Sequence, residues 1–187
     1  MKRAMWQMLA VMAFSLGLFA VGDSWAGPPA PSVHVGDAAP LFVLPAINSE
    51  PALRMTARAA VSLSDLTGVN PPYPADWVLV HFTDKAGGAV DLPVLDKVAR
   101  KYANRGLKVV AVVSDRSDIP VLSAWIEGLK LSYPALHDRH GVVASRYGIT
   151  QFPITMIVDK DGRIDALGAP TASMEAELDS LVATRIK

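Results

Sequence analysis

The segment Trp77-Val-Leu-Val-His-Phe82 decides the fold, because it is an apolar run of one strand's length that only His81 interrupts. Such runs are typical of strands buried on both faces, as in a parallel sheet covered by helices. Leu107-Lys-Val-Val-Ala-Val-Val113 repeats the pattern after a stretch with helical spacing, Asp91 to Tyr102. The two runs predict neighbouring central strands joined by a crossover helix.

The remaining segments complete an α/β order. Downstream, we expect helices over 118–129, 141–147 and 173–184, a strand over 154–158, a turn over 159–162 and a returning strand over 163–167. Upstream, 41–44 and 61–63 have the character of short strands, 48–60 shows no clear period, and the Pro-rich segment 70–76 excludes a regular element. The sequence predicts one α/β sandwich, with a central mixed sheet, helices on both faces and an N-terminal β extension.

The N-terminal residues have the three parts of a secretory signal peptide. A basic start at Lys2 and Arg3 precedes an apolar run over 8–21, and small residues flank a cleavage position after Ala26. The apolar run is shorter than the roughly 20 residues of a membrane span. We therefore expect a cleaved signal peptide over 1–26 and a periplasmic or secreted protein; an uncleaved anchor is the alternative. A Pro-rich linker over 27–33 then leads into a domain over 34–187.

Composition excludes several classes of function. The formal net charge is zero and basic runs are absent, which gives no electrostatic basis for nucleic-acid binding. The sequence contains no cysteine, so disulfides, thiolate zinc sites and Fe–S clusters are excluded. Phosphate-binding loops and nucleophile-elbow strings are also absent, and we expect no cofactor.

Several short strings resemble the thioredoxin-like superfamily, in particular its TlpA/ResA-like and redoxin (AhpC/TSA) branches. They follow one another in the family's order over roughly 35–181: Val35-Gly-Asp-Ala-Ala-Pro-Leu-Phe42, Val61-Ser-Leu-Ser-Asp-Leu-Thr-Gly68, Trp77-Val-Leu-Val-His-Phe82, Leu92-Pro-Val-Leu-Asp-Lys-Val98, Tyr133-Pro-Ala-Leu-His-Asp138, Tyr147-Gly-Ile-Thr-Gln-Phe-Pro153 and Ile157-Val-Asp-Lys-Asp-Gly162. The resemblance implies a thioredoxin-like fold.

The same resemblance locates a lost active site. Family members carry Cys-x-x-Cys before the proline that matches Pro93, and counting back from Pro93 places the two cysteines at Lys85 and Gly88. On a peroxiredoxin alignment, Ala86 takes the cysteine position. Either alignment removes the nucleophile, because thiolates perform this family's chemistry.

The resemblance also implies a peptide groove. Pro153 matches the family's cis-proline, and the backbone just before it pairs with bound peptides in family members. Gln151, Phe152 and Pro153 are therefore candidate groove residues. The alternative is that the cis bond only shapes the start of the strand 154–158.

Other candidate residues have a structural explanation beside the functional one. Lys85 is a possible nucleophile or Schiff-base lysine, but the sequence supplies neither burial nor a cationic neighbour, which favours an exposed loop residue. The Gly87-Gly88 pair favours a flexible turn over an anion site. Asp84 is expected to cap a helix, and His81 to be half-buried with its hydrogen bonds satisfied.

The remaining acidic and histidine residues are weaker candidates. His137 and His140 have metal-ligand spacing but need a third ligand. Asp138 is expected to cap the following helix. Asp159 and Asp161 before Gly162 indicate a turn rather than a calcium loop.

Two hypotheses follow for the function. The first is an exported, thioredoxin-like binding module without redox activity, which binds a peptide or protein partner on the old active-site face. The second is a redox auxiliary that acts without its own thiols, through Lys85 or a metal at His137 and His140.

Overall fold

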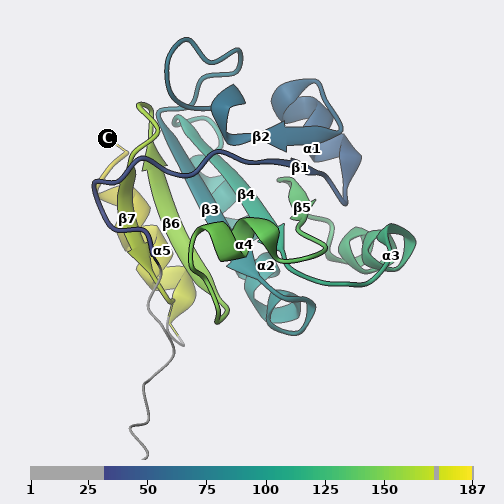
Figure 1. Ribbon diagram of the computed structural model, residues 1–187. Coiled ribbons are helices and arrows are strands. Elements are labelled where there is room, and N and C mark those ends of the chain that lie inside the picture. Colours follow the sequence, from purple (N-terminus) through teal and green to yellow (C-terminus); the bar gives the residue numbers. More distant parts are fainter. Residues whose placement is uncertain (1–31, 171–172, 187) are drawn as a thin grey trace, which may run out of the picture.

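The computed structural model describes residues 32–170 and 173–186 (Figure 1). The predicted signal peptide, and the linker up to residue 31, lie outside these residues. Val33, inside the predicted linker, is buried in the core, and the Ser32 backbone N–H donates to the Tyr147 carbonyl. Within the described part of the chain, no helix has the length and apolar character of a membrane span.

A five-stranded mixed sheet forms the centre, in the order β5-β4-β3-β6-β7. Its strands are β3 (Trp77–Thr83), β4 (Leu107–Val113), β5 (Ala135–His137), β6 (Ile154–Asp159) and β7 (Ile164–Gly168). Strands β3, β4 and β5 are parallel. On the other side of β3, β6 runs antiparallel to β3 and β7 runs antiparallel to β6. The predicted mixed sheet is therefore confirmed, and its three parallel strands end at one edge.

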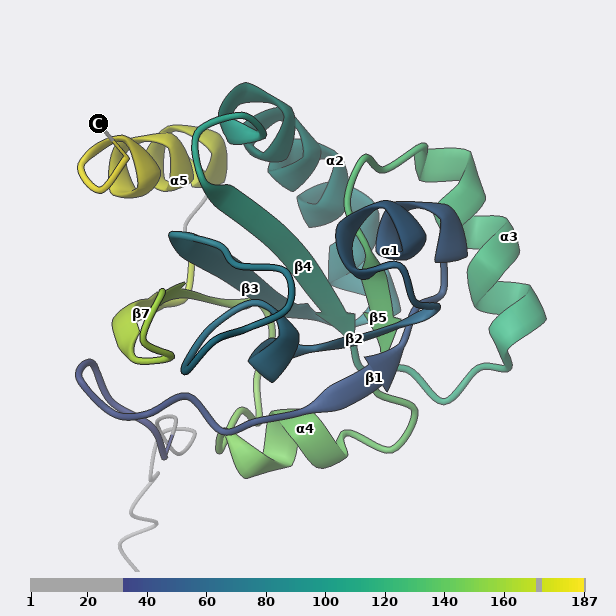
Figure 2. The same ribbon diagram turned by 90° about the horizontal axis from the view of Figure 1, so that it is seen from above.

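Helices cover both faces of this sheet (Figures 1 and 2). The elements α2 (Lys85–Tyr102), α3 (Ile119–Leu129) and α5 (Met174–Ala183) bury residues in the cluster on one face, and α4 (Val142–Arg146) does so on the other. A small antiparallel hairpin, β1 (Val43–Pro45) with β2 (Ala60–Ser62), lies beside β5 and flanks α1 (Ser49–Thr56).

The central strands alternate between two apolar cores. Val78, Val80 and Phe82 of β3 face the α4 side, while Leu79 faces the cluster that includes α2 and α5. The same alternation holds in β4 and β6, as the period of two in a strand requires. His81 and Thr155 are the polar exceptions at paired positions of β3 and β6, and both are buried.

Two expectations about local structure were wrong, and one helix was not predicted. Helix α2 begins at Lys85 rather than Asp91, because Asp84 provides a cap and the two glycines are accommodated in the first turn. Residues 49–56 form α1, whose weak sequence pattern reflects the few side chains that it buries. His81 is fully buried rather than half-buried, because both faces of β3 are covered.

Candidate functional site

The candidate site lies where β3 ends and α2 begins, at the edge shared by the carboxyl ends of the parallel strands. Asp84 accepts a hydrogen bond from the Gly87 backbone N–H at 2.7 Å, so the predicted cap is confirmed. Ile154 of β6 pairs with Phe82, and this register places Pro153 alongside Thr83. The Phe152–Pro153 peptide bond is cis. The two sequence-predicted groups therefore flank the paired ends of neighbouring strands, with 85–88 after β3 and 151–153 before β6.

Lys85 and Gly88, which the resemblance places at the two cysteine positions, are part of a regular helix. Lys85 is the first residue of α2 and is half-buried, so it is not the exposed loop residue expected from the sequence. Gly88 is buried, and a Cβ atom there would lie 3.0 Å from Cη2 of Trp125 and 3.2 Å from Cγ2 of Thr83. The space for a second thiol is therefore closed by a tryptophan of α3.

An exposed apolar stripe follows the first two turns of α2. Ala86, Ala89, Val90 and Pro93 are all exposed, at the spacing of one helix face. Val90 is 71% exposed, which is high for a β-branched apolar side chain in a regular helix. The start of α2 thus presents a small apolar surface to solvent, next to Lys85 and Gly88.

Gln151 and Phe152 form the other side of the site. Gln151 is exposed, while Phe152 is half-buried and packs against the α4-side core. Among the described residues, none hydrogen-bonds to the backbone N–H or carbonyl groups of these two residues. An extended peptide could therefore pair with them without displacing an existing partner.

Charged residues surround the site without forming a recognisable catalytic constellation. Burial opposes the charge on Asp115, but hydrogen bonds from Ser117 and the positive charge of Lys85 hold the pKa of that carboxyl below its usual value. His137 is buried and donates from Nε2 to the Asp115 carbonyl at 2.8 Å. Lys85 thus interacts favourably with the carboxylate of Asp115.

The histidine pair does not converge as a metal site would require. His140 is exposed while His137 is engaged with Asp115. Within residues 32–170 and 173–186, histidine and acidic side chains nowhere gather in groups of three or more that could hold a metal ion. Asp138 accepts from the Ala144 backbone N–H of α4 at 2.9 Å, which confirms its predicted capping role. Asp159 accepts from the N–H groups of Asp161 and Arg163, so the predicted turn is also confirmed.

Sequence reasoning missed that His81 is a buried polar group beneath the site. The expectation that its hydrogen bonds are satisfied was wrong, because Nε2 has no hydrogen-bond partner among the described residues. Nδ1 of His81 lies 2.8 Å from Oγ1 of Thr155, and Nε2 faces Asp91 of α2 at 3.7 Å. A histidine within an otherwise apolar central strand was the available signal. Trp125 was also missed as a site residue, because its role depends on how α3 packs against α2.

Comparison with known proteins assigns the family. Residues 35–167 match the AhpC/TSA family. The chain belongs to the AhpC/TSA family. It is 30% identical over 136 residues to the thiol-disulfide oxidoreductase ResA of Oceanobacillus iheyensis, a match that covers 72% of this chain and 64% of that protein. The chain is also 27% identical over 74 residues to the thiol-disulfide oxidoreductase ResA of Bacillus thuringiensis. These residues are 40% of this chain and 42% of that protein.

Solved structures show the same fold. A putative thiol:disulfide interchange protein DsbE from Chlorobium tepidum aligns with a TM-score of 0.64 at 24% identity, over 82% of this chain and 99% of that one. Peroxidoxin BcpB from Mycobacterium tuberculosis aligns with a TM-score of 0.61 at 21% identity, over 81% and 95%. The fold of this AhpC/TSA chain is thioredoxin-like, and the sequence contains no cysteine.

Proposed function

We propose that this AhpC/TSA chain is an exported binding module that holds an extended peptide segment of a partner protein and performs no thiol chemistry. The single observation that carries the proposal is the change at the helix start. The family's thiol positions are occupied by Lys85 and by Gly88 packed against Trp125, while the wall at Gln151 and Phe152 keeps its backbone groups unpaired.

The name groove is used below for the proposed peptide-binding surface, which has two walls. One wall is the apolar stripe of α2, which consists of Ala86, Ala89, Val90 and Pro93. The other is the segment Gln151-Phe152-Pro153. A strand laid along the second wall would gain main-chain hydrogen bonds, and it would lie at the edge of the sheet where α2 begins. Affinity would come from the backbone and the desolvated apolar contacts, and not from charge.

Export is part of the proposal. The basic start, apolar run and small-residue exit of residues 1–26 support it. One structural relative, from Mycobacterium tuberculosis, is described as a secreted disulfide oxidoreductase. A fusion of residues 1–26 to an alkaline phosphatase that is active only after export would show activity, and a fusion that starts at residue 27 would not.

Peptide selection tests the binding function. A displayed library of random linear dodecapeptides is selected on the purified domain, and retained peptides are measured by fluorescence anisotropy. Val90→Asp should weaken binding about tenfold or more, because it places a charge in the apolar wall. Val69→Asp is the matched control, since Val69 is 95% exposed in a loop outside the groove. Equal affinity of both variants would contradict the proposal.

An insulin-reduction assay tests the absence of thiol chemistry. With dithiothreitol as the electron donor, the purified protein should not accelerate the precipitation of insulin above the uncatalysed rate. Measurable turnover would exclude a purely non-catalytic role.

A further inference from the structure

The central strand β4 leaves part of one edge without a neighbouring strand. Its pairing with β5 covers only Ala111–Val113. The Ala111 backbone N–H points towards β5, because it donates to the Pro134 carbonyl at 3.0 Å. Backbone groups of residues two apart on a strand point to the same side, so those of Leu107 and Val109 face this open edge. Among the described residues, none hydrogen-bonds to them there.

Pro134 explains why the ladder stops. The register pairs Ala111 with Ala135, so one further step would set the Val109 carbonyl opposite the Pro134 nitrogen. That nitrogen carries no hydrogen and cannot donate. Backbone groups without a partner cost free energy when they are buried, so this edge requires water or another chain as its partner.

A cleft of about 570 Å³ lies along the open edge. Leu107 and Val109 line it from the sheet, while Arg54 of α1 and Arg100 of α2 line it from the helices. The whole-residue exposures of Leu107 and Val109 are only 5% and 3%, because their side chains belong to the core cluster that includes α2. Helix α1 lies on the same side of β4 as β5 (Figures 1 and 2). The cleft has the size of typical ligand sites, about 300–1,000 Å³.

The charged side chains that line this cleft are all cationic. They are Arg54, Arg100 and Lys108, and no aspartate or glutamate among the described residues lines it. Arg54 forms an ion pair with Glu50, and Arg100 forms one with Asp96 at 2.5 Å. These two pairs partly neutralise the arginines, so Lys108 carries the charge that remains unbalanced.

Lys108 has no acidic partner among the described residues. Its Nζ atom donates to the Tyr73 carbonyl at 2.8 Å, and no carboxylate lies within ion-pair distance. Burial lowers the pKa of the half-buried ammonium group, since nothing negative compensates for its lost hydration. A negatively charged group in the cleft would relieve this cost.

We infer that the cleft binds an extended, acidic segment of a partner protein, which pairs with Leu107 and Val109 as an added strand. A strand satisfies both the N–H and the carbonyl groups of the edge, whereas a simple anion accepts only from the N–H groups. Acidic side chains of the segment supply the charge that Lys108 lacks. A second copy of this chain fits poorly, because its own β4 edge would present the same cations.

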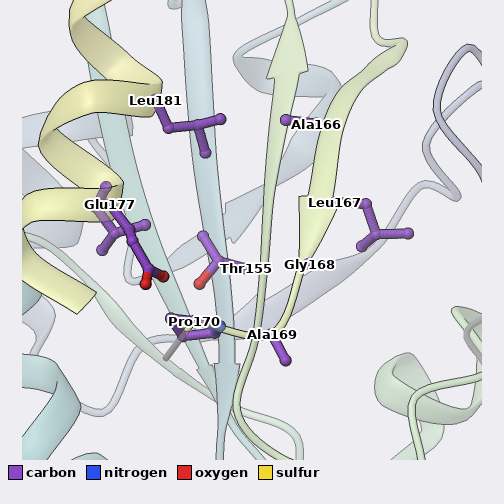
Figure 3. A pocket seen from close by; sticks show the side chains of 9 residues that line it. Thr155, Ala166, Leu167, Gly168, Ala169, Pro170, Glu177 and Leu181 are labelled. Carbon is purple, nitrogen blue, oxygen red and sulfur yellow. The ribbon is translucent and has the colours of Figure 1, made fainter. Parts of the chain in front are cut away.

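This site is distinct from the groove, since none of the groove residues lines the cleft. It also differs from the cavity of about 190 Å³ between β7 and α5 (Figure 3). Glu177 is the only charged residue among the described residues that line that cavity. Thr155, which also lines it, lies on a strand that is paired on both sides. That cavity therefore favours neither an acidic segment nor an added strand at Thr155.

The test selects displayed linear hexapeptides that carry Asp or Glu at alternate positions. The target is the purified domain with Val90→Asp, so that the apolar stripe does not contribute, and affinities are measured by fluorescence anisotropy. Lys108→Gln removes the charge but keeps a donor for the Tyr73 carbonyl, and it should weaken binding about fivefold or more. Lys160→Gln, at an exposed lysine outside the cleft, is the matched control and should leave the affinity unchanged. The absence of any retained peptide, or equal affinities of the two variants, would overturn the inference.

Backbone pairing is tested separately from charge. A selected peptide is made in two forms, each N-methylated at one of the two sets of alternate amides. Only one set can face β4, so one form should lose binding and the other should keep it. The Val109 amide should also exchange more slowly in the complex. Equal binding of both forms, or protection at Gln151 and Phe152 instead of Val109, would contradict strand addition at this edge. Because the target carries Val90→Asp, these results stand whether or not the groove binds peptides.

Discussion

Gly88 and Trp125 are in direct packing contact across α2 and α3. A Cβ atom added to Gly88 would lie 3.0 Å from Cη2 of the tryptophan, closer than ordinary van der Waals contact. In this chain, the position that resembles the family's second cysteine therefore serves as a packing position for an aromatic ring. Packing against Trp125 and the Asp84 cap stabilise the start of α2.

Because of the Gly88–Trp125 contact, the effect of Gly88→Ala on stability should depend on the side chain at position 125. Alanine in a helix is favoured over glycine by about 1 kcal/mol, but overpacking a filled site costs about 1–3 kcal/mol. Gly88→Ala should therefore destabilise the wild type by about 1 kcal/mol and stabilise a Trp125→Phe background by a similar amount. Urea unfolding of the wild type, the two single variants and the double variant measures this coupling. An identical effect in both backgrounds would show that the ring does not restrict position 88.

The cap of α2 is expected to contribute measurably to stability. Asp84→Ala removes the acceptor for the Gly87 N–H and should lower the free energy of unfolding by about 1 kcal/mol. Asp84→Ser retains an acceptor and should cost less. Asp118→Ala is the matched control, because Asp118 precedes α3 but makes no capping hydrogen bond. Denaturant titration measures all three, and equal losses at positions 84 and 118 would count against the cap.

The N-terminal segment packs against the chain at Gly148. This glycine has a φ of +68°, and a Cβ atom there would overlap the Ser32 backbone nitrogen and lie 2.7 Å from Ser32 Oγ. Gly148→Ala should destabilise the protein by about 2–4 kcal/mol, from backbone strain and overlap together. Gly141→Ala isolates the strain, because Gly141 has a φ of +63° and open space around it. Gly141→Ala should lower the free energy of unfolding by only about 1 kcal/mol, as measured by thermal or urea unfolding.

Asp115 should make the fold sensitive to acid. Its pKa in the folded protein lies below the unfolded value of 3.8, so its stabilising contribution is present above about pH 5 and is lost as the pH falls through the folded value. Asp115→Asn should therefore lose less stability than the wild type between pH 5 and pH 3. Urea unfolding at four pH values in this range measures the difference. Parallel curves for the two proteins would be inconsistent with the assigned hydrogen bonds.

Periodicity predicted the central elements because they are buried on regular faces. The run 107–113 matches β4 residue for residue, and 77–82 differs from β3 only at Thr83. The elements that were missed either bury few side chains or are very short. Helix α1 has only three buried side chains, and β5 is three residues long, too short to show a period.

The candidate site was predictable only in part for a related reason. The short strings that resemble the family pointed to Lys85, Gly88 and Pro153, because such strings can be recognised from the local order of residues. The closure of position 88 by Trp125 and the contact between His81 and Asp91 depend on how α3 and α2 pack, which no local pattern encodes.

Amide hydrogen exchange at the groove tests the central claim most directly. A dodecapeptide selected on the domain is bound to saturation, and exchange is followed residue by residue with NMR. The account predicts that the Gln151 or Phe152 amide, unpaired in the free protein, exchanges at least about tenfold more slowly in the complex. Saturating binding with unchanged exchange at both amides would contradict it.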